Sequence, residues 1–153
     1  MKIAIGSDHA GYELKEYLKR SLAEGHEVFD VGTENTASVD YPDYAVQVAR
    51  LVTEGKVDRG ILLCGTGIGM SVAANKVKGV RASLAFDLYT AKQARRHLDA
   101  NILVLGAHVT GKGLALEIAR TWINEPFEGG RHERRIEKIR RLEDDCHGRP
   151  EGQ

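Results

Sequence analysis

Cys64 lies between a short apolar run and a loop of alternating glycines, where a thiol could do chemistry. The segment reads ILLCGTGIGMSVAANK from Ile61 to Lys76, with glycines at 65, 67 and 69. Such glycines let several backbone N–H groups converge on one point, and a following helix adds the positive end of its dipole. A thiol beside these donors has its thiolate form favoured. The alternatives are a tight strand-to-helix turn and a small buried core residue, a common role for cysteine.

The glycine loop differs from two familiar phosphate-binding motifs. The dinucleotide fingerprint needs glycine where this chain has Met70, and a Walker A loop closes with Lys-Ser or Lys-Thr, which is missing from the loop. The loop could therefore hold negative charge, but it is not typical of a nucleotide-binding protein.

Four other polar residues adjoin apolar runs. Asp8 and His9 end the run KIAIGSDH, where an acid and an imidazole could exchange protons or bind phosphate. Asp8 is also a good helix N-cap residue, and His9 could simply be exposed. His97 precedes the run ILVLG and His108 follows it, and a lone histidine is more often structural than catalytic. The role of each residue therefore depends on where the fold places it.

Arg131 and Arg135 stand four residues apart at the start of a charged segment that follows Gly129 and Gly130. They share one helical face, and two guanidinium groups near a helix N-terminus suit a phosphate. The alternative is a solvated basic face. The six histidines and two cysteines show no metal-ligand spacing, so we predict neither a metal nor another cofactor.

Strand-like apolar runs alternate with amphipathic segments along the chain. Strands are predicted over 2–6, 27–31, 60–64, 81–86 and 102–106, and helices over 13–24, 42–52, 70–76, 90–97, 113–124 and 131–145. This alternation predicts an α/β protein with a three-layer, Rossmann-like fold, in which helices flank a five-stranded parallel sheet. Ligands of such folds bind at the carboxyl ends of the strands, so the residues that follow each strand are the candidates for function.

The composition limits the class of protein. The chain has 153 residues, with 22 basic and 22 acidic side chains, which argues against binding to nucleic acid or a membrane surface through net charge. No apolar run approaches the roughly 20 residues of a membrane span. Two cysteines make no disulfide framework, and we see no signal peptide, so we expect a cytoplasmic protein. A single domain is predicted over 1–147, with a frayed tail over 148–153.

Six motifs in fixed order resemble the B-type ribose-5-phosphate isomerases, a family that also includes galactose-6-phosphate and allose-6-phosphate isomerases. The motifs are GSDHAG (6–11), VDYPDYA (39–45), GILLCGTGIGMSVAANK (60–76), GVRA (79–82), HLDANILVLG (97–106) and FEGGRHERR (127–135). Each motif alone is modest, but six in one order are highly specific.

The resemblance implies a metal-free aldose–ketose isomerase that acts on a sugar phosphate through an enediolate. It implies that Cys64 is the base between C1 and C2, and that His97 opens the sugar ring. Asp8 and Thr66 handle the hydroxyl protons. The anion hole is formed by backbone amides of the loop, those of Gly65, Gly67, Ile68 and Gly69. His9, Arg131 and Arg135 are implied as phosphate ligands.

The family forms homodimers, often paired into tetramers, and the resemblance implies that the partner chain supplies the segment around His97. In one branch of the family a later glutamate replaces the cysteine as base. Here Cys64 is present and that later position is Met70, so the chain falls in the cysteine branch.

Two positions of the expected substrate pocket depart from the family pattern. Leu98 stands where asparagine is usual, and His108 stands where arginine is usual. We predict isomerisation of ribose 5-phosphate and ribulose 5-phosphate, in the pentose phosphate pathway, with Leu98 and His108 as substrate contacts. The alternatives are the same reaction on allose or galactose 6-phosphate or a tetrose phosphate, and, from another class, a nucleotide-binding or regulatory flavodoxin-like module.

Overall fold

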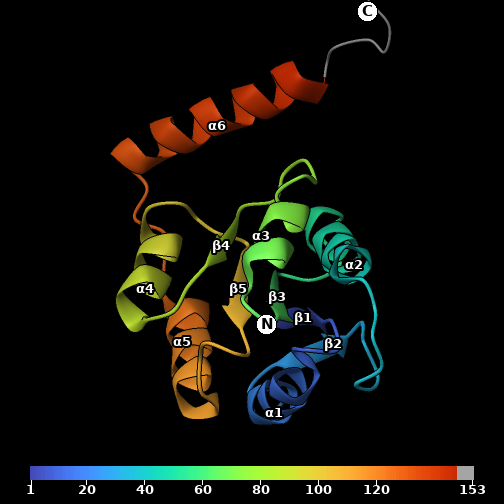
Figure 1. Cartoon of the computed structure of the whole chain (residues 1–153). Coiled ribbons are helices and arrows are strands. Elements are labelled where there is room, and N and C mark those ends of the chain that lie inside the picture. Colours follow the sequence, from blue (N-terminus) through green and yellow to red (C-terminus); the bar gives the residue numbers. More distant parts are fainter. Residues whose placement is uncertain (148–153) are drawn as a thin grey trace, which may run out of the picture.

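Five parallel strands form the centre of the computed structural model, which describes residues 1–147 (Figure 1). The strands are β1 (Lys2–Ser7), β2 (Glu27–Asp30), β3 (Arg59–Cys64), β4 (Ala82–Leu84) and β5 (Ile102–Gly106), in the spatial order β2-β1-β3-β5-β4. The tail predicted over 148–153 lies outside the described residues.

Helices cover both faces of the sheet. They are α1 (Tyr12–Leu22), α2 (Tyr41–Thr53), α3 (Ile68–Ala74), α4 (Leu88–Arg96), α5 (Lys112–Asn124) and α6 (Arg131–His147). The apolar sides of α1, α4 and α5 share one core cluster on one face, and those of α2 and α3 share a second cluster on the other. This arrangement is the three-layer, Rossmann-like fold that the sequence predicts. Among the described residues, the structure contains no helix with the length and hydrophobicity needed to span a membrane.

The central strand β3 shows why the thiol faces a particular layer. Side chains alternate between the two faces of a strand. Ile61 and Leu63 therefore join the cluster under α1 and α5, and Leu62 and Cys64 join the cluster under α2 and α3. Since both faces are covered, the strand reads as a continuous apolar run.

Several predicted boundaries differ from the structure by one or two residues. Strand β4 ends at Leu84, two residues early, and α4 begins at Leu88, two residues early. Asp87 explains the second shift, because its carboxylate accepts a hydrogen bond from the Thr90 N–H at 2.7 Å and caps the helix. Helix α3 also begins early, since Gly67 acts as its N-cap and accepts the Ser71 N–H at 3.0 Å.

Helix α6 lies apart from the layers, across the top of the molecule in Figure 1. Its second half is joined to the segment before β4, where Glu143 accepts the Gly79 N–H at 3.2 Å and Lys78 pairs with Asp144 at 2.5 Å. Ile136 is its buried anchor. The second half of the helix therefore lies beside the segment that leads into β4, at the amino end of that strand.

Candidate active site

The thiol of Cys64 lies at the carboxyl end of β3 and is held by the loop that follows. Its side chain is almost fully buried, and the Gly67 N–H donates a hydrogen bond to Sγ at 3.1 Å. A backbone N–H that points at sulfur stabilises negative charge there. Cys64 is therefore both a buried core residue and a thiol beside a backbone N–H donor, the two alternatives that the sequence offers.

Glycine is required in this loop by its backbone shape. Gly67 has φ +81°, in the left-handed region that other residues rarely adopt. Thr66 is exposed, and its Oγ1 accepts the Ile68 N–H at 3.3 Å. The ring of Tyr41 lies over Gly69, where a Cβ would be only 2.5 Å from Tyr41 Cζ. Tyr41 therefore forms one wall of the loop.

Asp8 and His9 follow β1, next to β3 in the sheet, and both are held by backbone N–H groups. Asp8 Oδ1 accepts the N–H groups of Ala10 and Gly11 at 3.0 and 3.1 Å, in the turn before α1. The N-cap residue of α1 is Gly11 and no side chain caps this helix, so the alternative role of Asp8 as N-cap residue is wrong. His9 Nδ1 accepts the Val39 N–H at 3.2 Å. A neutral His9 then carries its proton on Nε2, which is free to donate to an anion.

His108 joins these residues from β5. Its backbone N–H donates to the Gly65 carbonyl at 2.9 Å, and a Cβ on Gly65 would be 2.8 Å from His108 Cδ2. The imidazole therefore lies against the glycine loop. We call this group, Asp8, His9, Cys64, the loop 65–69 and His108, the Cys64 region.

The other predicted residues form a second group at the far edge of the sheet. His97 caps the C-terminal end of α4, and its ring stacks on that of His132, with centroids 4.1 Å apart and planes 11° apart. Glu128 Oε2 is 3.7 Å from His97 Nε2 and 3.3 Å from His132 Nε2. Arg131 and Arg135 are exposed on the first turns of α6. We call His97, Leu98, Glu128, Arg131, His132 and Arg135 the His97 region.

Burial and nearby charges shift the pKa values of two groups in the His97 region, His132 and Glu128. Burial lowers the pKa of His132 below its ordinary 6.5, and the nearby His97, Arg131 and Arg135 lower it further, against Glu128. Partial burial acts to raise the pKa of Glu128, but Arg96, His97 and His132 outweigh it, so this pKa lies below 4.5. At neutral pH, His132 is therefore neutral and Glu128 is charged.

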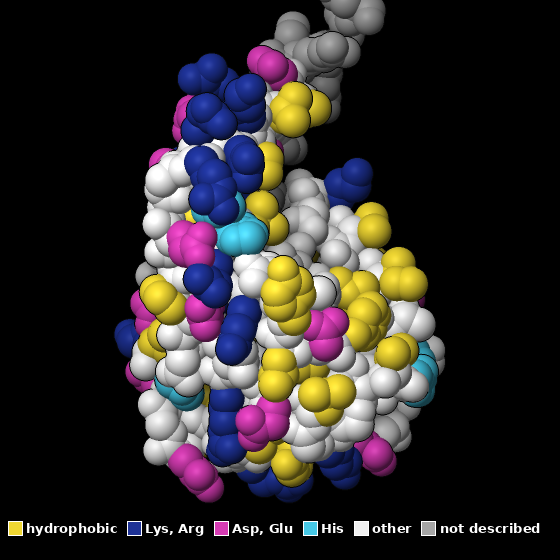
Figure 2. Space-filling view, turned by 90° about the vertical axis from the view of Figure 1, so that its left-hand side faces the viewer, with side chains coloured by type: hydrophobic (Ala, Val, Ile, Leu, Met, Phe, Trp, Pro, Cys, Tyr) yellow, Lys and Arg dark blue, Asp and Glu magenta, His cyan; other side chains and the backbone are white. Residues whose placement is uncertain are grey.

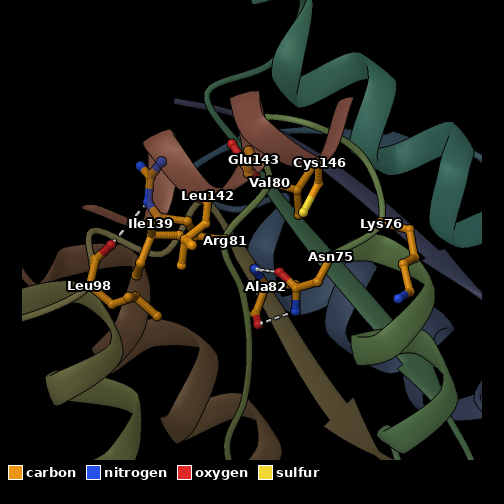
Figure 3. A pocket seen from close by; sticks show the side chains of 10 residues that line it. All are labelled: Asn75, Lys76, Val80, Arg81, Ala82, Leu98, Ile139, Leu142, Glu143 and Cys146. Atoms are coloured by element: carbon orange, nitrogen blue, oxygen red, sulfur yellow. Dashed lines mark hydrogen bonds between the residues drawn. The ribbon is translucent and has the colours of Figure 1, made fainter. Parts of the chain in front are cut away.

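Leu98 lines a hollow of about 480 Å³ under α6 (Figure 3). The hollow is mostly apolar and includes Ile139, Leu142 and Cys146. The next residue, Asp99, has φ +48° and contacts Arg95 at 2.9 Å and Arg81 at 3.3 Å. Leucine at position 98 thus has an apolar environment within the chain, and its contact with substrate stays a prediction.

One chain does not bring the two regions together. Cys64 pairs in register with Gly106, the last residue of β5, and His97 precedes Ile102, the first residue of β5. The strand between them is about 13 Å long at the usual rise per residue. Catalytic groups act within hydrogen-bonding reach of the reacting atoms, so a single small substrate cannot contact both regions of the same chain.

His97, Glu128 and His132 are also a possible metal-ligand group, with ligand atoms within 4.8 Å of one another. The sequence spacing does not show it, because the fold joins α4 to the segment before α6. The rings of His97 and His132 are nearly parallel, so the lone pairs of their nitrogens run side by side and do not converge on one position where a metal ion could lie. Glu128 also forms an ion pair with Arg96, whose Nη2 lies 2.6 Å from Glu128 Oε1. The geometry therefore fits a stacked pair better than a metal centre.

The sequence alone does not single out Glu128 and His132 of the His97 region, or Tyr41, which lies against the loop of the Cys64 region. Each lies within a motif that was read for another residue, VDYPDYA or FEGGRHERR. The signal was their presence in these motifs, but only the fold shows which side chain each one contacts.

Comparison with known proteins identifies relatives that match most of the chain. The family model described as Ribose/Galactose Isomerase matches residues 3–139. Ribose-5-phosphate isomerase B of Escherichia coli is 48% identical, over 93% of this chain and 96% of that protein. D-erythrulose-4-phosphate isomerase of Pectobacterium atrosepticum is 44% identical, over 91% of this chain and 93% of that protein.

Solved structures agree with the sequence matches. Ribose-5-phosphate isomerase B of Clostridium thermocellum is 51% identical and superposes with a TM-score of 0.95, over 95% of this chain and 99% of that one. The Mycoplasma genitalium enzyme, solved with bound ribulose 5-phosphate, is 43% identical, with a TM-score of 0.90 over 94% of this chain and 97% of that one.

Proposed function

Because this chain belongs to the ribose/galactose isomerase family, as an isomerase of the ribose-5-phosphate isomerase B type, we propose that it interconverts ribose 5-phosphate and ribulose 5-phosphate. The observation that carries the proposal is the Cys64 thiol, held by the Gly67 N–H at the mouth of the glycine loop. Moving a proton between the carbons of a sugar needs a base and donors for the oxygen that becomes negative, and this loop offers both.

In the proposed reaction, the Cys64 thiolate removes the proton from C2 of the open-chain aldose. The electron pair of that C–H bond forms the C1–C2 double bond, and the carbonyl oxygen at C1 becomes negative. Loop N–H groups stabilise this enediolate. Asp8 and Thr66 move the hydroxyl proton from the oxygen on C2 to the oxygen on C1, and Cys64 returns its proton to C1 to complete the ketose.

The proposed site is composite, with the Cys64 region of one chain facing the His97 region of a second copy. The strand length that separates the two regions within a chain supports this arrangement. Exposed apolar side chains adjoin the Cys64 loop: Ile68 and Val72 on α3, and Phe86, Leu88 and Tyr89 around the start of α4. Figure 2 shows hydrophobic side chains gathered below the histidine and the Lys and Arg of α6. A second copy that covers this surface could place His97, Arg131 and Arg135 beside Cys64.

The phosphate would then be held by groups from both chains. Arg131 and Arg135 offer two guanidinium groups, and His9 offers its Nε2–H. His108 is exposed beside Gly65 and provides a weaker cation than arginine in the same place. Relatives of similar identity are named for a pentose phosphate and for a tetrose phosphate, so identity at this level does not fix the sugar, and we expect the departure at His108 to influence the choice.

An isomerase assay across four-, five- and six-carbon aldose phosphates tests the proposal, with Cys64→Ala protein as the control for contaminating activity. We expect the highest kcat/KM with ribose 5-phosphate. A higher value with erythrose 4-phosphate would move the assignment to a tetrose phosphate. Turnover of none of these sugars would overturn it.

A further inference from the structure

His97 has two neighbours to which the proposed reaction assigns no role. The ring of His132 lies flat against that of His97 at 4.1 Å, and Glu128 faces the Nε2 atoms of both rings. The three side chains differ sharply in exposure, because the His97 side chain is 42% exposed and that of His132 only 4%. His132 is thus a buried ring against which His97 stacks, and His97 is the ring that a substrate can reach.

Backbone contacts join these residues into one unit. The Glu128 N–H donates to the Arg96 carbonyl at 3.0 Å, and Arg96 Nη2 contacts Glu128 Oε1 at 2.6 Å. Arg96 directly precedes His97, and Glu128 lies three residues before Arg131. The backbone next to His97 is therefore joined to the segment that leads into α6, which carries Arg131 and Arg135.

The unpartnered state of His132 is a second sign that this arrangement serves a purpose other than stability. Its Nε2 is buried without a hydrogen bond, although Glu128 Oε2 is only 3.3 Å away. A buried polar atom without a partner costs free energy. Phenylalanine or leucine would avoid that cost if His132 were only a packing residue.

We propose that Glu128 and His132 are positioning residues for His97, an inference that rests on the proposed ring-opening role of His97. Stacking on His132 fixes the plane of the His97 ring. The carboxylate of Glu128 favours the tautomer of His97 with its proton on Nε2. The groups around His97 are Glu128, His132 and Arg96, with Arg131, Arg135, Asp99 and Glu125 nearby. Among the described residues, Glu128 is the only acid within 4.0 Å of a ring nitrogen of His97. The Glu128 segment also leads into the first turn of α6, so the same unit carries Arg131, a proposed phosphate ligand.

The two directions of the reaction separate this role from a merely structural one. Ribose 5-phosphate closes into a ring that must be opened before the proton moves. Ribulose 5-phosphate cannot close a five-membered ring, because the oxygen on C5 carries the phosphate. Deuterium exchange at its C1 therefore reports proton transfer by Cys64 without ring opening.

The variants are Glu128→Gln, His132→Ala and His132→Phe, with Glu125→Gln as a matched control. Glu125 also contacts Arg96, at 3.5 Å, but makes no pair with His97. We expect Glu128→Gln and His132→Ala to lower kcat for ribose 5-phosphate by about tenfold, the size of effect typical of groups that orient a functional histidine. Exchange at C1 of ribulose 5-phosphate should stay within about twofold. His132→Phe keeps a flat ring but lacks the nitrogen that faces Glu128, so it should recover part of kcat and not all of it, and Glu125→Gln should match the wild type.

The ¹⁵N NMR signals of the His97 imidazole provide a readout without turnover. The Nε2–H tautomer should dominate in the wild type and lose its preference in Glu128→Gln, whatever the stability of the variant. Equal losses in both directions, no gain of His132→Phe over His132→Ala, or an unchanged tautomer would each overturn the positioning role. A wild type without either activity would instead overturn the proposed function.

Discussion

The Cys64 region and the His97 region are built in opposite ways. Around Cys64, the side chains are positioned mainly by the backbone, because backbone N–H groups donate hydrogen bonds to Cys64 Sγ, Asp8 and His9. Around His97, side chains hold one another through a ring stack and a network on Glu128. Fixed backbone dipoles suit the negative charge that develops during proton transfer. Long side chains that extend from a helix suit a site in another copy of the chain.

Loss of the base should produce the largest effect and separate the regions most clearly. We predict that Cys64→Ala lowers kcat by about 10³-fold or more, because it removes the group that transfers the proton. In the proposed site the phosphate is held mainly by the other region, so the Kd for ribose 5-phosphate should change little. Proton NMR in D₂O measures exchange, and calorimetry measures Kd. Exchange at the wild-type rate would remove Cys64 from the mechanism.

Loss of the imidazole in the His97 region should slow the reaction of ribose 5-phosphate more than that of ribulose 5-phosphate. We predict that His97→Asn lowers turnover of ribose 5-phosphate by about 10²-fold, the contribution of a general acid or base. Exchange at C1 of the acyclic ribulose 5-phosphate should be largely spared. A coupled assay and D₂O exchange provide the two rates. If both rates fall together, His97 takes part in proton transfer itself and the division between the regions fails.

Mixing the two inactive variants tests whether the regions meet between chains. Dimers of Cys64→Ala with His97→Asn contain one site with both residues intact and one site with neither. Isolated mixed dimers should therefore have about half of wild-type activity, and an unfractionated random mixture, in which half of the dimers are mixed, about a quarter. Co-expression with two affinity tags isolates the mixed dimers for the assay, and each variant alone is the control. Failure to complement, with mixed dimers present, would place the whole site in one chain.

The corner of the site at His108 should show a smaller change. His108→Arg replaces a cation that depends on pH with one that is charged at every working pH. We predict that KM for ribose 5-phosphate falls by about three- to tenfold at pH 8, the scale of one added charge–phosphate contact. Less change is expected at pH 6.5. Steady-state kinetics of both proteins at the two pH values measure it, and equal KM values throughout would exclude contact with the phosphate.

The smallest effect concerns stability and the His97 region alone. The folded pKa of His132 is lowered from 6.5, so between that value and the folded pKa the unfolded chain binds more protons than the folded one. Stability is then lost as pH falls through this window. We predict that His132→Phe loses about 1–3 °C less in Tm than the wild type between pH 7.5 and 5.5. Thermal unfolding by circular dichroism measures both, and parallel losses would mean that His132 binds its proton equally in both states.

The sequence alone determined the sheet, its helices and the residues that follow the strands. The apolar runs and amphipathic periods fixed the order of elements, because both follow from local geometry. Glycines at 65, 67 and 69 located the loop, since the left-handed φ of Gly67 requires that residue. Boundaries such as the start of α4 moved by two residues, because Asp87 caps a helix whose apolar pattern begins later.

Only the tertiary structure decided which residues share a site. His97 and Cys64 both adjoin predicted strands, but one lies before β5 and the other lies level with its end, so the length of the strand separates them. His132 and Glu128 lie more than 30 residues from His97 in sequence, and they meet it because the segment before α6 hydrogen-bonds to the end of α4. Contacts between residues so far apart depend on how the elements pack, which no local pattern of residues encodes.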